Sequence, residues 1–307
     1  MLRYNELVKS RLLVLCFVGV SSFAHASFEL ALLTTVGSNA ITRVDPENRI
    51  LLGSFGANRL IAPRAIAART TDSEAYILNS YGFGGSRITV MNYFTGATIR
   101  EFSVNAGPSV FDLELLSNGE VFVTNGSSIL RYSATGALIQ TIAGSEAYTS
   151  VSYSEFFNEV YGHSATGTRY FSGDTGTSFG FVAGSNMSGA NASQGSRVTM
   201  GGDGQNLRRF NHLTLGYLST TFTGMNSINA VGYGHGTTAY AAGFGTAGQS
   251  TITTFDTTKL NRLSDAWNIT GGGNGITGIA VVTAPEPGTF LALGAGLAAI
   301  LRRRKRK

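Results

Sequence analysis

A segment of about 40 residues recurs along this chain and limits the folds that the chain can adopt. Each copy contains an apolar or aromatic stretch, a short polar loop, a second such stretch and a turn centred on glycine. The clearest copy reads NGEVFVTNGSSILRYSATGALIQTI. Glycine tolerates the positive φ that a tight reversal needs, and four glycines recur at an interval of 40 residues: Gly96, Gly136, Gly176 and Gly216.

A repeat of this length with four short strands is typical of a β-propeller blade. One blade alone exposes both faces of its small sheet, so the blades are stable only when they close into a ring. Two weaker copies lie around Asn48 and Lys259 and bring the number to six. The sequence therefore predicts an all-β, six-bladed propeller. A seven-bladed ring with a blade hidden in 185–206, or a β-sandwich, stays open.

The two ends of the repeat region predict how the ring closes. Three strand-like stretches begin the region, FELALLTTV, AITRV and RILLGSF, and a single one, NGITGIAVV, ends it at 274–282. We expect the last stretch to complete the blade that the first three begin. The Gly/Ser/Asn-rich stretch at 183–206 is expected to form a long surface loop with one degraded strand.

The first 26 residues have the order of a secretory signal peptide. A basic segment with Arg3, Lys9 and Arg11 precedes the apolar stretch LLVLCFVGVSSF. Small residues follow at Ala24 and Ala26, so cleavage before Ser27 is expected. Cys16 is the only cysteine and is lost with this segment, so the exported chain uses no disulfide.

The C-terminus has three parts in order. Pro285, Glu286 and Pro287 form an extended strip, because proline is excluded from a helix interior. Residues 288–301 follow as an apolar run that spans about 21 Å as a helix, short of the hydrocarbon thickness of about 30 Å. A basic cluster then ends the chain and is expected to stay on the cytoplasmic side: Arg302, Arg303, Arg304, Lys305, Arg306 and Lys307.

This tripartite tail resembles the PEP-CTERM sorting signal of exported proteins from Gram-negative, exopolysaccharide-producing bacteria. The resemblance implies recognition by an exosortase, removal of the tail, and release or attachment at the cell surface. The copy around Gly136 also resembles NHL-type propeller repeats. We thus expect a signal helix in 1–26, a propeller in 27–283, and a sorting segment with a short transmembrane helix in 284–307. We also expect the protein to be exported by the Sec pathway and held briefly in the inner membrane.

Charge argues against nucleic-acid binding. The tail cluster and the signal segment hold nine of the 23 basic residues, which leaves the body with 14 basic and 16 acidic side chains. A nucleic-acid-binding domain normally carries a basic stripe. No nucleic-acid partner is therefore expected.

Few residues in the body have the spacing of a chemical site. His163, His212 and His235 lie at different places in their repeats, so we expect separate surface or blade-edge histidines and no metal site. The sequence GGDGQN at 201–206 predicts a turn; a calcium loop is the alternative, but most of its ligands are missing.

Asp112 and Glu114 share one face of a strand, which would suit an acid–base pair, yet such residues are more often solvated.

The aromatic loops and strand ends could bind sugars or pack between blades, and packing is favoured. We expect a non-catalytic surface or matrix propeller without a cofactor, with an exosortase and extracellular polysaccharide or surface proteins as partners. A periplasmic or secreted propeller lyase or lactone hydrolase with a channel metal is the alternative.

Overall fold

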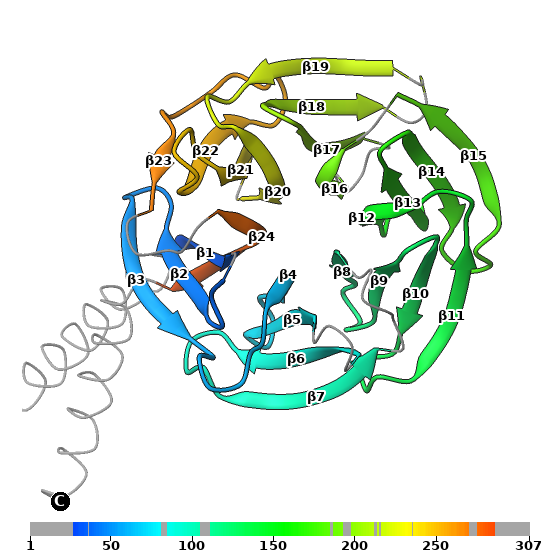
Figure 1. The fold of residues 1–307 in the computed structure, drawn as a ribbon, viewed down its shortest axis with the longest axis horizontal. Coiled ribbons are helices and arrows are strands. Elements are labelled where there is room, and N and C mark those ends of the chain that lie inside the picture. Colours follow the sequence, from blue (N-terminus) through cyan, green and yellow to red (C-terminus); the bar gives the residue numbers. More distant parts are fainter. Residues whose placement is uncertain are drawn as a thin grey trace, which may run out of the picture. The chain divides into compact units, whose positions relative to one another are not determined.

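The computed structural model describes residues 27–285, except for 36, 81–84, 105–110, 185–186, 193–197, 212–213, 215, 235 and 270–274. These residues form six four-stranded antiparallel sheets and no helix. The sheets are arranged as blades around a central axis (Figure 1). The six-bladed prediction is confirmed, and the seven-bladed and sandwich alternatives are wrong.

From the centre outward, the blades contain the following strands. Blade one has β24 (Ile276–Pro285), β1 (Ser27–Thr35), β2 (Ile41–Asp45) and β3 (Ile50–Phe55). Blade two has β4 (Pro63–Arg69), β5 (Glu74–Ser80), β6 (Ser86–Asn92) and β7 (Thr98–Val104). Blade three has β8 (Leu113–Leu115), β9 (Val121–Asn125), β10 (Ser128–Tyr132) and β11 (Leu138–Ala143).

The remaining blades follow the same path. Blade four has β12 (Tyr148–Ser154), β13 (Glu159–Ser164), β14 (Gly167–Ser172) and β15 (Ser178–Ala183). Blade five has β16 (Ser188–Ala192), β17 (Val198–Asp203), β18 (Asn206–Asn211) and β19 (Gly216–Phe222). Blade six has β20 (Ser227–Tyr233), β21 (Thr238–Phe244), β22 (Ser250–Asp256) and β23 (Trp267–Asn268).

Blade one closes the ring with strands from both ends of the chain. The last strand, β24, lies innermost beside β1, as the sequence predicted. The Thr277 hydroxyl donates to Thr34 Oγ1 at 2.9 Å, which joins the start of β24 to the end of β1. The two strands are therefore antiparallel.

The expectation for 183–206 was wrong in part. This stretch supplies two strands, β16 and β17, where one degraded strand and a loop were expected. The sequence of β16, SGANA, lacks the alternation of apolar and polar residues that marks a strand. Its position is fixed by contacts to the next blade, such as the Ser188 hydroxyl donating to the Ile228 carbonyl at 2.7 Å.

The apolar core lies between neighbouring blades. One cluster joins Tyr76 and Ile88 of blade two to Val121 and Leu130 of blade three, and all four side chains are buried. Comparable clusters join blades three and four, five and six, and six and one. In these four pairs each blade covers the apolar face of the next, and this burial favours ring closure.

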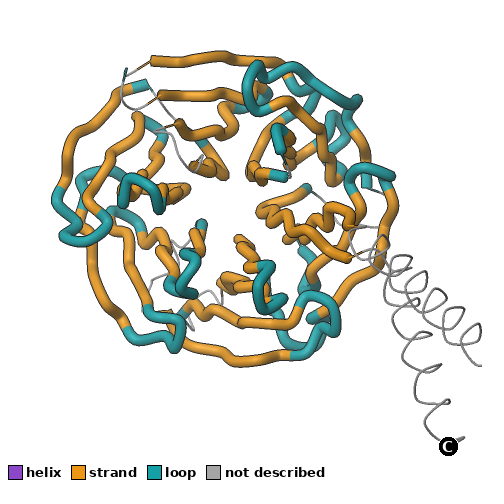
Figure 2. The backbone as a smooth tube through the Cα atoms, turned by 180° about the vertical axis from the view of Figure 1, so that it is seen from behind, coloured by secondary structure: helices purple, strands orange, loops and turns teal. Residues whose placement is uncertain are grey.

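The ring has two distinct faces, seen from opposite sides in Figures 1 and 2. Because neighbouring strands are antiparallel, alternate connections lie on opposite faces. The face that carries the β4–β5 and β6–β7 connections, and the equivalent connections of the other blades, is called the terminal face. The face that carries the β5–β6 and β7–β8 connections and their equivalents is called the opposite face. The chain enters the ring unit Leu30–Val282 at Leu30 and leaves it at Val282, both on the terminal face. The second unit consists of Met1–Glu29 and Thr283–Lys307.

Charge is unevenly divided between the two faces. Among the described connections, the opposite face carries Arg59, Asp112 and Glu146. The terminal face carries a larger set: Glu47, Arg49, Asp72, Glu120, Glu155, Asp174, Lys259, Arg262 and Asp265. The described connections of the terminal face therefore carry more charged residues than those of the opposite face, where the ion pairs Arg169–Glu146 and Arg208–Asp203 lie at strand ends.

Candidate functional site

A cavity of about 340 Å³ lies in the channel at the centre of the ring. It is lined mainly by small and apolar residues from the innermost strands β4, β20 and β24, including Ala67, Gly232 and Gly278. Blade three contributes the two acidic residues of the lining: Asp112, just before β8, and Glu114, on β8. Asp112 and Glu114 thus both lie at the wall of the channel cavity and are only partly exposed, whereas the sequence suggested solvated side chains.

Asp112 is held in place by three hydrogen bonds. Its Oδ2 accepts from the Ser150 hydroxyl at 2.6 Å and from the Val151 amide at 3.1 Å, and its Oδ1 accepts from the Leu113 amide at 3.0 Å. Burial nevertheless raises the pKa of Asp112 to about 6, although these donors oppose the shift. Asp112 therefore joins blade three to β12 of blade four and remains able to titrate near neutral pH.

Glu114 lies two residues further on and has no hydrogen-bond partner among the described residues. Burial, and then the charges of Asp112 and Glu155, raise the pKa of Glu114 well above its ordinary value. Tyr233 lines the same cavity from β20, and burial raises the pKa of its phenol as well. The channel can therefore hold a protonated carboxyl and a phenol as hydrogen-bond donors at neutral pH.

Glu114→Gln should stabilise the ring at alkaline pH. A carboxyl whose folded-state pKa is raised binds a proton more tightly when folded, so its stabilising effect falls as pH rises from about 4 through the folded-state pKa. We expect the variant to melt several degrees above the wild type at pH 8 and close to it at pH 4. Thermal melts at both pH values test this, with Asp174→Asn in an exposed turn as the control; an equal gap at both pH values would contradict it.

His163 lies inside blade four, not at a surface or blade edge as expected. Its ring is fully buried, with Nε2 at 3.0 Å from the Ser152 hydroxyl and Nδ1 at 2.9 Å from the Thr168 hydroxyl. Both nitrogens are therefore satisfied by neutral partners in the sheet. His212 and His235 lie outside the described residues, and within the described part of the chain no three His, Cys, Asp or Glu side chains gather as metal ligands.

Three of the four repeat glycines occupy the same turn in successive blades. Gly96, Gly136 and Gly176 have φ values of 73°, 91° and 69° in the turns before β7, β11 and β15. Each lies against the outermost strand of the preceding blade: a Cβ on Gly96 would come 2.9 Å from Phe55, and one on Gly136 would come 2.4 Å from Phe102. Gly216 differs, because it begins β19 opposite Asn211. The glycines thus allow the turn and the close approach of two blades.

Arginine side chains bridge the blades on the terminal face. Arg43 donates to the Phe94 carbonyl of the next blade at 2.8 Å, Arg100 to that of Ala134 at 3.0 Å, and Arg131 to that of Gly173 at 2.9 Å. The three accepting carbonyls belong to the turns that carry the repeat glycines. The same turn of each blade therefore packs against, and is hydrogen-bonded to, the blade before it.

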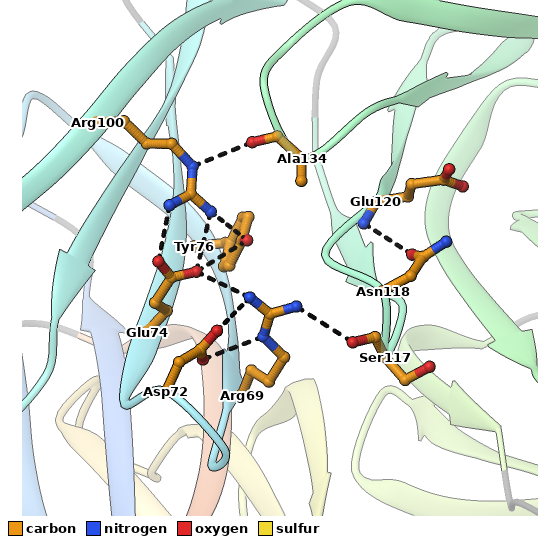
Figure 3. A network of polar contacts seen from close by, with 9 residues as sticks. All are labelled: Arg69, Asp72, Glu74, Tyr76, Arg100, Ser117, Asn118, Glu120 and Ala134. Carbon is orange, nitrogen blue, oxygen red and sulfur yellow. Dashed lines mark hydrogen bonds and ion pairs between the residues drawn. The ribbon is translucent and has the colours of Figure 1, made fainter.

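Glu74 is the centre of the network drawn in Figure 3. Arg100 pairs with both of its carboxylate oxygens at 2.7 and 2.9 Å, and Arg69 approaches Oε2 at 3.1 Å. Arg69 also pairs with Asp72 and donates to the Ser117 carbonyl of blade three at 3.1 Å. The hydrogen bond from Arg100 holds the pKa of Glu74 below its ordinary value.

Glu74→Gln should cost about 2 kcal/mol at pH 7, because it leaves two half-buried guanidinium groups without their carboxylate. Glu101→Gln is the matched control: Glu101 is 30% exposed and pairs with Arg87 at 3.3 Å, so we expect about 0.5 kcal/mol. Because the folded-state pKa of Glu74 is lowered, its carboxylate stabilises the ring above the unfolded-state pKa of about 4, and this contribution decreases as pH falls from there toward the folded-state pKa. The difference in unfolding free energy between Glu74→Gln and wild type should therefore be smaller at pH 3 than at pH 7. Urea unfolding at both pH values measures it; a gap that stays constant would contradict this role.

The predicted processing sites lie at the limits of the described chain. Ser27 is the first residue of β1, and Pro285 is the last residue of β24. The other sorting and cleavage residues fall outside the described residues: Ala24, Ala26, Glu286, Pro287, Arg302, Arg303, Arg304, Lys305, Arg306 and Lys307. The same holds for the expected signal helix and transmembrane helix, and no helix within the described residues could cross a membrane.

Comparison with known proteins supports both the tail and the fold. Residues 283–307 match the PEP-CTERM protein-sorting motif, which indicates export, temporary anchoring in the membrane and processing by an exosortase-type enzyme before the cell surface. No curated protein matches the sequence.

Two solved structures resemble the ring. A protein of unknown function from Bacteroides caccae has a TM-score of 0.61 at 12% identity, with 83% of this chain and 99% of that chain covered. A chain of a nidogen/laminin complex has a TM-score of 0.65 at 13% identity, with 82% and 98% covered. At these identities the likeness shows a shared fold.

Proposed function

For a chain that carries a PEP-CTERM sorting motif behind a six-bladed propeller, we propose the role of an extracellular binding or scaffold protein. Its ring would bind extracellular polysaccharide, such as that of a biofilm, or surface proteins. The observation that carries this proposal is that the sorting motif begins within the closing strand of the ring: the match starts at residue 283, and β24 ends at Pro285. The tail thus delivers a closed ring.

The opposite face is the proposed binding surface. The chain enters and leaves the ring on the terminal face, so the opposite face carries neither end of the ring unit. The connections of the opposite face are mostly uncharged, which suits a neutral, hydroxyl-rich polymer. A structural neighbour with this fold belongs to a nidogen/laminin complex, which supports a role in protein assembly.

Two variants separate the sorting function from the binding function. Replacing Pro285, Glu286 and Pro287 with alanine should leave the protein in the membrane fraction at full mass. Ala247→Arg on the opposite face should reduce retention on the cells' own immobilised polysaccharide or surface-protein extract by about tenfold, as expected when a central contact worth about 1.4 kcal/mol is lost. The matched control is Ala137→Arg, which is likewise exposed but lies on the terminal face. Unchanged retention of both variants would contradict the binding face.

The channel favours a second candidate, a propeller lyase or lactone hydrolase. Asp112 and Glu114 line the same cavity, and burial raises the pKa of both, which suits general acid–base catalysis near neutral pH. Assays on uronate-containing polysaccharides and lactones, with wild type and Glu114→Gln, test it. Turnover that the variant loses would support the enzyme; turnover of neither substrate class would exclude it.

A further inference from the structure

Several carboxylates of the ring are neutralised by arginine. These pairs are Glu74 with Arg100, Glu120 with Arg131, Glu146 with Arg169, and Asp203 with Arg208. The channel cavity differs, because its described lining contains Asp112 and Glu114 but no lysine, arginine or histidine. Removal of a carboxylate from water is costly unless a positive charge compensates for it. The described lining supplies no such charge, so the cavity is suited to a positively charged guest.

Two polar groups of this lining also have no hydrogen-bond partner among the described residues. They are the carboxyl group of Glu114 and the phenol of Tyr233. Asp112 differs from them, since three donors hold its carboxylate in place. Polar groups in a folded protein are normally satisfied once they are removed from water. Glu114 and Tyr233 are therefore available to a bound molecule.

The rest of the lining is small and mainly apolar. Residues such as Ala67, Gly232 and Gly278 form the wall of a cavity of about 340 Å³. Small-molecule sites commonly enclose about 300 to 1,000 Å³, with apolar walls and a few polar groups. Tyr233 adds an aromatic ring, and the face of such a ring attracts cations. The cavity thus suits a compact molecule with one charged end and an apolar remainder.

We propose that the channel cavity binds a small organic cation, an ammonium group on a compact apolar body. The ammonium group would donate to Glu114 beside the charge of Asp112, and the body would contact the alanine and glycine wall. A divalent metal fits less well, because calcium takes six to eight oxygen ligands, and no three His, Cys, Asp or Glu side chains gather among the described residues. This site does not depend on the proposed binding at the opposite face and requires no turnover.

The ammonium group would replace a proton on Glu114. Burial, and then the charges of Asp112 and Glu155, raise the pKa of Glu114, and a positive charge beside it would lower that pKa again. Burial also raises the pKa of the Tyr233 phenol, which stays neutral, and Arg209, whose charge opposes that shift, is not part of the lining. Binding should therefore release a proton and be stronger at alkaline pH than at acidic pH.

Titration with benzylamine and with its uncharged isostere benzyl alcohol tests this inference. Isothermal titration calorimetry is run at pH 8 on the full chain in an uncharged detergent, where the alkylammonium group stays protonated. We expect the wild type to bind benzylamine about tenfold more tightly than benzyl alcohol, which corresponds to about 1.4 kcal/mol. Glu114→Gln should reduce this ratio of affinities to about one, because it removes the charge that the ammonium group pairs with.

Asp174→Asn is the matched control, because it makes the same carboxylate-to-amide change in an exposed turn outside the cavity lining. It should keep the tenfold ratio. A ratio near one in the wild type, binding of neither probe, or equal ratios for the two variants would overturn the inference. The comparison of the two probes in the wild type stands without either variant, and loss of polysaccharide binding at the opposite face would not affect it.

Discussion

A chain that ends at Gly275 should show no cooperative unfolding, whereas a chain that ends at Pro285 should melt as a folded ring. The truncation removes Ile276, Ile279 and Val282, which are buried at 0%, 6% and 3% exposure. Full burial of such a side chain contributes about 1.5 to 3 kcal/mol, so the three together approach the total stability of about 5 to 15 kcal/mol of a natural domain. The loss also leaves β1 without its inner neighbour.

Circular dichroism melts and limited proteolysis of residues 27–275 and 27–285 measure this effect. The longer chain is the control, because it lacks the same signal and tail. If the shorter chain melted cooperatively within a few degrees of the longer one, blade one would be stable without its fourth strand, and closure by β24 would not hold the ring together.

Gly136→Ala should lower the melting temperature by about 10 °C, which corresponds to about 3 kcal/mol in a domain of this size. The substitution places a side chain at a φ of 91°, which costs about 1 to 2 kcal/mol, and brings its Cβ to 2.4 Å from Phe102, which adds about 1 to 3 kcal/mol. The substitution therefore weakens the contact between blades two and three.

Gly204→Ala is the control for the backbone cost alone. Its φ is 58°, and a Cβ there would meet nothing within 4 Å, so we expect a drop of about 3 °C. In a Phe102→Ala background, Gly136→Ala should cost no more than this control. Equal drops for Gly136→Ala and Gly204→Ala in the wild-type background would show that the blades do not meet closely at this turn.

The repeat made the architecture predictable, because each blade has an apolar face that a neighbouring blade must bury. The glycines at 96, 136 and 176 carry the signal, since the turn and the close blade contact both exclude a side chain there. The strand SGANA was missed, because its place is set by neighbouring blades and not by its own pattern.

The channel residues and the buried histidine could not be placed from sequence for a related reason. Asp112 and Glu114 alternate with apolar neighbours, as solvated residues do, and only the closed ring places them at the wall of the channel cavity. His163 is likewise a polar residue in a strand of alternating pattern. Its partners Ser152 and Thr168 come from β12 and β14, the two strands beside β13. Register across strands decided these positions, and single-sequence patterns do not report it.

The intact mass of the protein recovered from outside the cell tests the central claim, that a tail processed at the membrane delivers a closed ring. We predict a chain that begins at Ser27 and lacks the apolar run and the basic cluster, and a heavier, membrane-bound form in cells without the exosortase. An extracellular chain that still carries Arg302–Lys307, with the same mass whether or not the exosortase is present, would contradict it.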